Sequence, residues 1–212
     1  MMKKEKKLVV EYCQKLLSRG LTRGTGGNIS ILDREKGRLA ISGSGIDYDR
    51  MTAEDVVVMD LEGHILEGSV KPSTEYPLHL ACYKKRQDIS AVVHTHSIYC
   101  TTLACMRRGI EPVHYLLGFA GERVDCIPFY PIGSQELADH TAEALAERNG
   151  VLMGNHGFTA VGPSITYAFA AAEETEFVAE IYYRTLLAGG GQLLTSEEMA
   201  PMLAMAEGYI KK

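Results

Sequence analysis

The chain has 212 residues, of which 46% are hydrophobic and 23% charged, and its formal net charge is −5. This length suits one domain with a core of its own, which we assign to residues 1–212. The acidic balance argues against nucleic acid as a partner, because nucleic-acid binders carry a basic face. No apolar run approaches the roughly 20 residues of a membrane span, so we expect no membrane insertion.

The amino-terminal segment and the cysteines predict a cytoplasmic protein. The segment MMKKEKKLVVEYCQKLL is basic, but polar residues interrupt its apolar part and it lacks a secretory cleavage site. The cysteines are odd in number, irregularly spaced and without a C-x-x-C pair: Cys13, Cys82, Cys100, Cys105 and Cys126. These features favour reduced thiols and a cytosolic setting.

The first half of the chain reads as a helix, two hairpins and a second helix. Apolar side chains recur on one face of the first helix, and Gly20 can end it. Alternating β-branched residues predict the hairpins. Pro72 with Ser73-Thr74 predicts the start of the second helix. The segments, in order, are 5–19, 26–42, 55–68 and 71–86.

The second half alternates strands and helices. Ser134 is the expected N-cap of one helix, Gly150 its stop, and Gly208 is expected to interrupt the last helix. The segments are a strand at 89–93, a helix at 97–107, a strand at 124–133, a helix at 134–150, a strand–turn–strand unit at 151–162, and two final helices, the second opening at 195–198. This order predicts a single α/β domain whose central sheet is mixed, largely antiparallel and flanked by helices on both faces.

His94 and His96 stand one residue apart at the end of the apolar strand. Side chains alternate between the faces of a strand, so both imidazoles point the same way and can grip one metal ion. Two surface histidines at a strand end are the plain alternative, and the pair alone does not decide between them.

Two further features favour a metal site. His156 lies near glycines after the strand VLM, where the backbone can bend sharply and aim a side chain. Glu75 lies near the start of a predicted helix. Three neutral imidazoles and a carboxylate suit Zn²⁺, or another divalent ion such as Mn²⁺ or Co²⁺. His64, His79 and His140 are interpreted as ordinary histidines, and His114 is left open.

Two other metal folds fit less well. A cupin would place a glutamate three or four residues after the histidine pair, where this chain has none. A 2-His-1-carboxylate iron oxygenase would leave His156 without a role.

Three loops share small residues, hydroxyl groups and free backbone N–H groups: TGGNIS, SGSG and KPSTE. Such loops can form anion nests, and Ser73-Thr74 would stand at a helix N-terminus, where negative charge is favoured. Each loop by itself is most often a turn or a cap. Together with a metal motif they predict a phosphate held by neutral donors, hence a sugar-phosphate ligand.

At this point the chain resembles the class II aldolase/epimerase family, along nearly its whole length. The matching segments are GTGGNIS, SGSGIDY, KPSTEYPLH, AVVHTHS, VHYLLGFAGE, GSQELADH and NHGFTAVG. The resemblance is greatest to the aldolase branch that cleaves L-fuculose 1-phosphate. The ordered set of Glu75, His94-x-His96 and His156 is the specific part of the match.

The resemblance implies a role for each matching residue. His94, His96 and His156 would bind the metal, and Glu75 would be its fourth ligand and the catalytic acid/base. Tyr115 would reach the active site of a neighbouring subunit in a homotetramer, and Tyr209 would help to position the aldehyde. The phosphate contacts would come from Gly27, Asn28, Ser44, Gly45, Ser73 and Thr74.

The implied reaction is reversible cleavage of a ketose 1-phosphate between C3 and C4, giving dihydroxyacetone phosphate and an aldehyde. The resemblance makes L-fuculose 1-phosphate the expected substrate, and its aldehyde product is L-lactaldehyde. Thr74 stands where that branch usually has a serine, and Ile132 stands where we expect an aromatic residue. The second departure leaves the aldehyde open.

Other activities of the same family remain alternatives. One is a methylthioribulose-1-phosphate aldolase or dehydratase, for which Glu122 is a candidate acid. Another is L-ribulose-5-phosphate 4-epimerase, although that branch typically carries Asp at the position of Glu75. A non-catalytic interaction domain like the adducin head is a remote alternative, because such domains lose the Glu/His set that this chain keeps.

Overall fold

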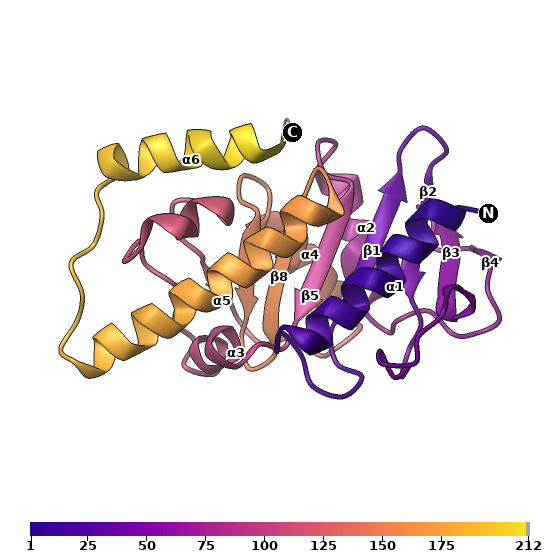
Figure 1. Cartoon of the computed structure of the whole chain (residues 1–212), viewed down its shortest axis with the longest axis horizontal. Helices are drawn as coiled ribbons and strands as arrows, with labels where there is room; N and C mark the ends of the chain where they lie inside the picture. Colours follow the sequence, from indigo (N-terminus) through magenta and orange to yellow (C-terminus); the bar gives the residue numbers. More distant parts are fainter. Residues whose placement is uncertain (211–212) are drawn as a thin grey trace.

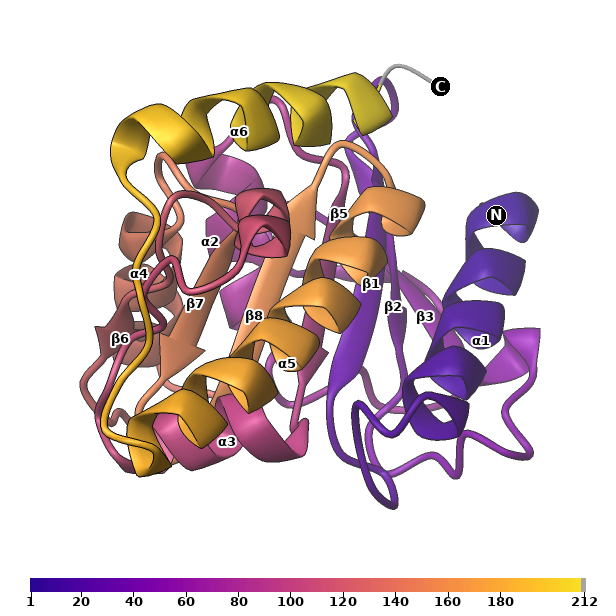
Figure 2. The same ribbon diagram turned by 60° about the vertical axis from the view of Figure 1, so that its left-hand side comes forward.

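An eight-stranded sheet forms the centre of the molecule (Figures 1 and 2). The computed structural model describes residues 1–210, without the side chains of residues 207, 209 and 210. The strand order is β4-β3-β2-β1-β5-β8-β7-β6, and every neighbouring pair is antiparallel except the parallel pair β6–β7. The strands are β1 (Asn28–Asp33), β2 (Arg38–Ser42), β3 (Val56–Asp60), β4 (Ile65–Glu67), β5 (Ala91–Thr95), β6 (Cys126–Ile127), β7 (Gly150–Met153) and β8 (Gly157–Gly162).

Helices cover both faces of this sheet. In Figure 2, α1 and α5 lie in front of it and α2 and α4 behind it, while α3 and α6 lie at its opposite ends. The helices are α1 (Lys3–Ser18), α2 (Tyr76–Lys85), α3 (Ile98–Cys105), α4 (Gln135–Ala144), α5 (Ile165–Leu187) and α6 (Ser196–Ile210), with short 3-10 turns η1 (Ala53–Asp55) and η2 (Tyr115–Phe119). Within residues 1–210, no helix combines the length and the apolarity needed to cross a bilayer.

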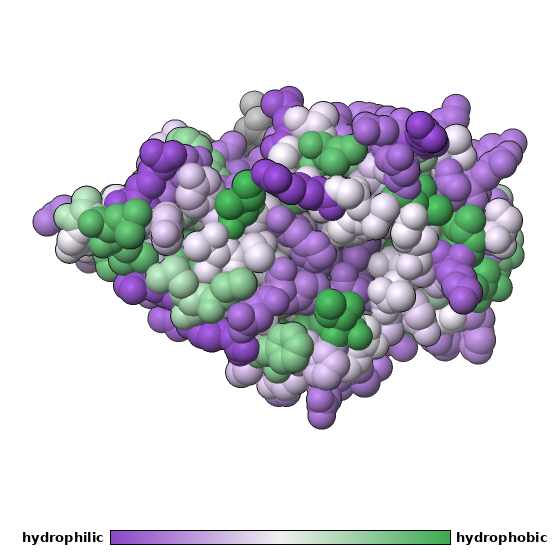
Figure 3. All heavy atoms as spheres, turned by 90° about the horizontal axis from the view of Figure 1, so that it is seen from below, coloured by the Kyte–Doolittle hydropathy of each residue, from purple (hydrophilic) through white to green (hydrophobic). Residues whose placement is uncertain are grey.

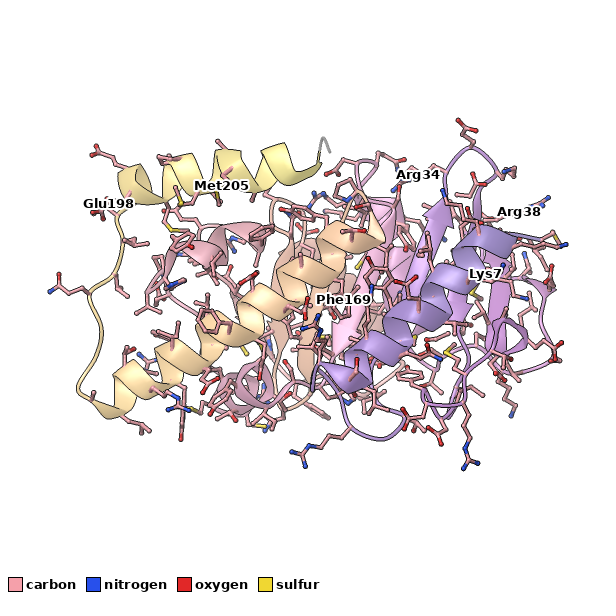
Figure 4. All side chains as sticks on the ribbon, viewed as in Figure 1. Lys7, Arg34, Arg38, Phe169, Glu198 and Met205 are labelled. Atoms are coloured by element: carbon pink, nitrogen blue, oxygen red, sulfur yellow. The ribbon has the colours of Figure 1, made fainter. Side chains whose placement is uncertain are left out.

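Each face of the sheet has its own hydrophobic core. Neighbouring residues of β5 point to opposite faces, so Val93 packs under α1 and α5 while Val92 packs under α2 and α4. Tyr12 of α1 meets Phe169 of α5 with ring centroids 5.1 Å apart, and Phe169 is labelled in Figure 4. On the other face, Tyr83 of α2 is fully buried.

The structure confirms the predicted fold class and most of the elements. Both hairpins form, and the strand–turn–strand unit around His156 is present as β7 and β8. Ser134 caps α4, since its hydroxyl accepts a hydrogen bond from the backbone N–H of Leu137 at 3.1 Å. The five cysteines are free, as expected.

Two predicted helix boundaries are wrong. The helix expected to begin after Pro72 begins at Tyr76, with Pro77 in its first turn, where the missing N–H costs no hydrogen bond. The helix expected to stop at Gly150 ends at Ala144. Gly150 instead opens β7, and its lack of a side chain serves packing there, since a Cβ would lie 2.8 Å from Ala120 and Phe158.

Two further expectations are corrected. The strand predicted at 124–133 contains only the two residues of β6, because Pro128 and Pro131 lack the N–H that a ladder needs. Gly208 does not interrupt the last helix, since α6 continues to Ile210. A glycine in an exposed helix costs only about 1 kcal/mol relative to alanine.

Candidate active site

The strand register brings distant parts of the chain together at one end of the sheet. Asn28, the first residue of β1, is paired with His94 near the end of β5. On the other side, Thr95 of β5 is paired with Phe158 at the start of β8. The turn that carries His156 therefore lies beside the histidine pair, although about 60 residues of chain separate them.

The β7–β8 turn is shaped to present His156. Asn155 has a φ of 57°, a left-handed conformation that asparagine tolerates better than most residues. Its backbone N–H donates to the carbonyl of Ala104, and its side-chain oxygen accepts from Arg107, so the turn is tied to the end of α3. Gly157 follows, where a Cβ would lie 2.3 Å from the Thr95 carbonyl oxygen.

The three histidines and Glu75 form one compact cluster. Their candidate ligand atoms all lie within 4.8 Å of one another. The Nε2 atoms of His94 and His96 are 3.0 Å apart. The Glu75 carboxylate lies 3.3 Å from His94 Nε2 through Oε2 and 3.2 Å from His156 Nε2 through Oε1.

Burial keeps these imidazoles neutral. It is the main cause that holds the pKa of His94 and His96 below the usual histidine value, and it lowers the pKa of His156 to about 3. A neutral imidazole is the form that binds metal at pH 7. His94 Nδ1 donates to the carbonyl of Phe158 at 3.0 Å, so the lone pair of this ring is on Nε2, which faces the cluster.

Several atoms of the cluster lack partners in the described part of the chain. Glu75 Oε1 and both ring nitrogens of His156 are buried without a hydrogen bond. Orphaned polar atoms in the interior are costly, and a cation bound here would give partners to Glu75 Oε1 and His156 Nε2. With zinc bonds of about 2.0–2.1 Å, two ligands of a tetrahedral site lie roughly 3.3 Å apart, close to the spacings here. The donor set thus fits a divalent metal ion.

A cavity of about 280 Å³ opens beside the cluster. It contains all six residues predicted to contact phosphate, together with Glu75, His96 and His156. Its other lining residues are Thr25, Gly26, Gly43 and Ile132. Figure 3 looks at the molecule from the end where α3 lies and shows hydrophilic residues gathered at the centre of that surface.

The cavity offers neutral donors to an anion. Among its lining residues there is no lysine or arginine. The backbone N–H groups of Ser44 and Ser73 are already bonded to Lys71 and Ser42, so these residues offer their hydroxyls. No acceptor within residues 1–210 takes the N–H groups of Gly45 and Thr74, which leaves both for a ligand. Ser73 and Thr74 lie before Glu75, the N-cap of α2, and do not open the helix as expected. The positive end of the helix dipole is therefore farther from these two residues than predicted.

The two predicted tyrosines lie elsewhere in the chain. Tyr115 is in η2 and is 45% exposed, and it is not among the cavity's lining residues. Tyr209 is within α6, its side chain is outside what the structure describes, and residues 211–212 are outside the described residues. In Figures 1 and 2, α6 lies at the opposite end of the sheet from α3.

Comparison with known proteins gives the family. The family model "Class II Aldolase and Adducin N-terminal domain" matches residues 7–183. The chain belongs to the class II aldolase family. A relative from Bacillus thuringiensis serovar kurstaki named 5-deoxy-D-ribulose 1-phosphate aldolase is 46% identical over 209 residues, 99% of this chain and 98% of the relative.

Two more proteins that resemble this class II aldolase have names that mention other sugar phosphates. An Escherichia coli O45:K1 protein named 5-methylthioribulose-1-phosphate/5-deoxyribulose-1-phosphate aldolase is 36% identical over 83% of this chain and 82% of its own. A solved structure titled L-fuculose 1-phosphate aldolase superposes with a TM-score of 0.95 at 39% identity, covering 98% of each chain.

Sequence reasoning located the cluster but missed what surrounds it. Glu75 Oε2 accepts a hydrogen bond from Asn28 Nδ2 at 2.9 Å, and Asn28 in turn contacts His79 at 2.6 Å. His79 is a buried, hydrogen-bonded core histidine, as the sequence allows, and its contact with Asn28 is the feature that the sequence did not predict. Its four-residue spacing from Glu75, one turn of helix, was the available signal that both lie on one side of α2.

Gly157→Ala tests how the site of this class II aldolase is packed. The new Cβ would lie 2.3 Å from Thr95 O and 2.9 Å from the His96 ring, so it should displace the histidine pair. We expect metal content after dialysis to fall well below one ion per chain. Gly208→Ala, where a Cβ meets nothing within 4 Å, is the control and should keep its metal. Full metal occupancy in Gly157→Ala would show that the close packing is dispensable.

Proposed function

We propose that this protein is a metal-dependent aldolase that reversibly cleaves a ketose 1-phosphate into dihydroxyacetone phosphate and a short aldehyde. The observation that carries the proposal is the meeting of the Glu75/His94/His96/His156 cluster with a cavity of about 280 Å³ that is lined by neutral donors. Family membership and the named relatives agree with this chemistry.

We propose Zn²⁺ as the ion, held by His94, His96 and His156, with Glu75 as the fourth ligand. Three imidazoles and a carboxylate are typical of zinc, and Mn²⁺ or Co²⁺ suits the same donors. Bound there, the ion would act as a Lewis acid that stabilises the negative charge developing on the substrate when the C3–C4 bond breaks.

The remaining roles belong to the chain's own residues. Hydroxyl and N–H groups of the three loops hold the phosphate and thereby place C3 near Glu75. Glu75 returns a proton to C3 after cleavage and removes it in the synthetic direction. Once Glu75 is released from the metal, Oε1, which accepts no hydrogen bond within the described chain, is the oxygen proposed to carry the proton.

Tyr115 is proposed to take the proton of the C4 hydroxyl from a neighbouring subunit of a homotetramer. Its exposed side chain and its position outside the cavity lining support action between chains. Tyr209 is proposed to help to position the aldehyde. It belongs to α6, which lies at the opposite end of the sheet from α3, and this placement likewise favours a role in the active site of a neighbouring subunit.

The proposed substrate is a 5-deoxypentulose 1-phosphate, whose aldehyde product is acetaldehyde. Two of the relatives carry deoxyribulose-phosphate names. Ile132, which is 62% exposed at the cavity, offers an aliphatic contact and no hydrogen-bonding group to the aldehyde end. L-Fuculose 1-phosphate, with L-lactaldehyde as product, is the second candidate, supported by the solved structure of that name.

The other activities of the family have less support. The dehydratase would need an acid such as Glu122, which accepts a hydrogen bond from Ser196 of α6 and is not among the cavity's lining residues. The epimerase branch typically has Asp where this chain has Glu75. An interaction domain like the adducin head would not need a buried cluster of four ligand groups.

The direct test is a cleavage assay on zinc-loaded protein with a panel of ketose 1-phosphates. We expect dihydroxyacetone phosphate from 5-deoxyribulose 1-phosphate at the highest kcat/KM, with 5-methylthioribulose 1-phosphate and L-fuculose 1-phosphate slower. Chelation of the metal should abolish all cleavage. A higher kcat/KM for L-fuculose 1-phosphate would reverse the proposed preference, and no cleavage of any member would refute the aldolase.

Glu75→Gln should separate proton transfer from metal binding. The amide keeps the shape and one oxygen ligand but cannot carry the C3 proton. We expect proton exchange at C3 of dihydroxyacetone phosphate to fall by about 10²–10⁴-fold with most of the metal retained. Exchange at the wild-type rate would assign the proton to another group.

Tyr115→Phe, unlike Glu75→Gln, should impair cleavage and leave proton exchange at C3 intact. It removes the tyrosine hydroxyl that is proposed to take the proton from the C4 hydroxyl of the substrate. Cleavage should therefore fall steeply, while proton exchange at C3 survives. Mixed tetramers of Tyr115→Phe and Glu75→Gln subunits should regain activity, because some sites then combine two intact residues. Joint loss of exchange and cleavage in Tyr115→Phe, or no recovery after proven subunit exchange, would contradict the role between chains.

A further inference from the structure

A row of buried polar groups leads from α2 through β1 to the carboxylate of Glu75. Tyr83 OH lies 2.7 Å from Ser30 Oγ, and Ser30 Oγ lies 2.6 Å from His79 Nδ1. His79 Nε2 lies 2.6 Å from Asn28 Oδ1, and Asn28 Nδ2 lies 2.9 Å from Glu75 Oε2. All five residues are buried, and His79, Ser30 and Tyr83 are fully so.

The chemistry of the end groups fixes the direction of each hydrogen bond. An ionised carboxylate only accepts, so Asn28 donates to Glu75 through Nδ2 and presents its Oδ1 to His79. That oxygen also only accepts, so His79 Nε2 carries the proton. In a neutral ring Nδ1 then accepts, and it takes the hydroxyl proton of Ser30.

The row continues in the same sense to its far end. The Ser30 hydroxyl proton is engaged with His79, so the Tyr83 hydroxyl must be the donor in its contact with Ser30. Tyr83 shares its proton between Ser30 Oγ at 2.7 Å and the backbone carbonyl oxygen of Ser30 at 3.0 Å. Burial lowers the pKa of His79 to about 4, which keeps the ring neutral at pH 7. Every donor in the row therefore points toward Glu75.

We propose that His79 is a positioning residue of the active site, which locks the Asn28 amide so that its N–H, and not its carbonyl, faces Glu75 Oε2. This inference rests on the role proposed above for Glu75. With Oε2 held, Oε1 stays turned toward His156 and the cavity. A reversed amide would set two acceptor oxygens about 2.9 Å apart, which repels the carboxylate from its place.

The assignment also gives Asn28 a task other than phosphate binding. Asn28 lines the cavity, but its Oδ1 and one Nδ2 proton are committed to His79 and Glu75. His79 itself does not line the cavity. A change at His79 should therefore affect Glu75 through Asn28, while the other predicted phosphate contacts, which form no hydrogen bond with His79 within residues 1–210, stay in place.

The test compares His79→Leu with His79→Gln in the full-length protein. Leucine fills the space without a donor, whereas the glutamine amide can still donate to Asn28 Oδ1. For His79→Leu we expect about 10–100-fold weaker zinc affinity by chelator competition. With zinc saturating, we expect C3 exchange of dihydroxyacetone phosphate to slow by a similar factor in kcat at nearly unchanged KM. His79→Gln should recover most of both.

Ser30→Ala is the second variant and serves if His79→Leu does not fold. It removes the donor to His79 Nδ1, so the ring proton can move to Nδ1 and the Asn28 amide loses its lock. We again expect weaker zinc affinity and slower C3 exchange, each changed by a smaller factor than in His79→Leu. Equal losses in His79→Leu and His79→Gln, or a raised KM with unchanged kcat, would overturn the positioning role. If wild-type protein shows no exchange at all, the proposed function fails, while the zinc affinities still decide the role of His79.

Discussion

The antiparallel register of β5 between β1 and β8 is the constraint on which the site depends. Pairing Asn28 with His94 and Thr95 with Phe158 sets both neighbouring strands against the end of β5. A slip of one residue would turn the strand's side chains to the opposite faces. The register is itself fixed by the apolar residues of β5, which fill a different core on each face of the sheet.

Burial at this end of the sheet has an electrostatic consequence. A carboxylate and three imidazoles lie together, with Glu75 only 5% exposed and three cluster atoms unbonded within the described chain. An isolated buried carboxylate is unfavourable, and neutral imidazoles do not balance it. A divalent cation bound among these groups would supply the missing positive charge. The donor row ending at Asn28 adds a hydrogen bond to Oε2 of the same carboxylate.

Local patterns in the sequence predicted the hairpins, the fold class and the meeting of Glu75 with the three histidines, the last through family resemblance. Boundaries set by tertiary contact were not predictable. Gly150 reads as a helix stop but opens a strand, where Ala120 and Phe158 leave no room for a side chain. His79 reads as ordinary, because its partners come from a strand about 50 residues away in the chain. Such pairings depend on which strands become neighbours in the sheet, and no local pattern specifies that.

X-ray absorption at the zinc edge of zinc-loaded wild-type protein tests the central claim most directly. The cluster predicts three imidazole nitrogens at about 2.0–2.1 Å, completed by oxygen, and one imidazole fewer in His156→Ala. Fewer than three imidazoles in the wild type, sulfur in the coordination shell, or a spectrum that His156→Ala leaves unchanged would contradict it. Each of these would mean that the zinc is bound elsewhere and that the cluster serves another purpose.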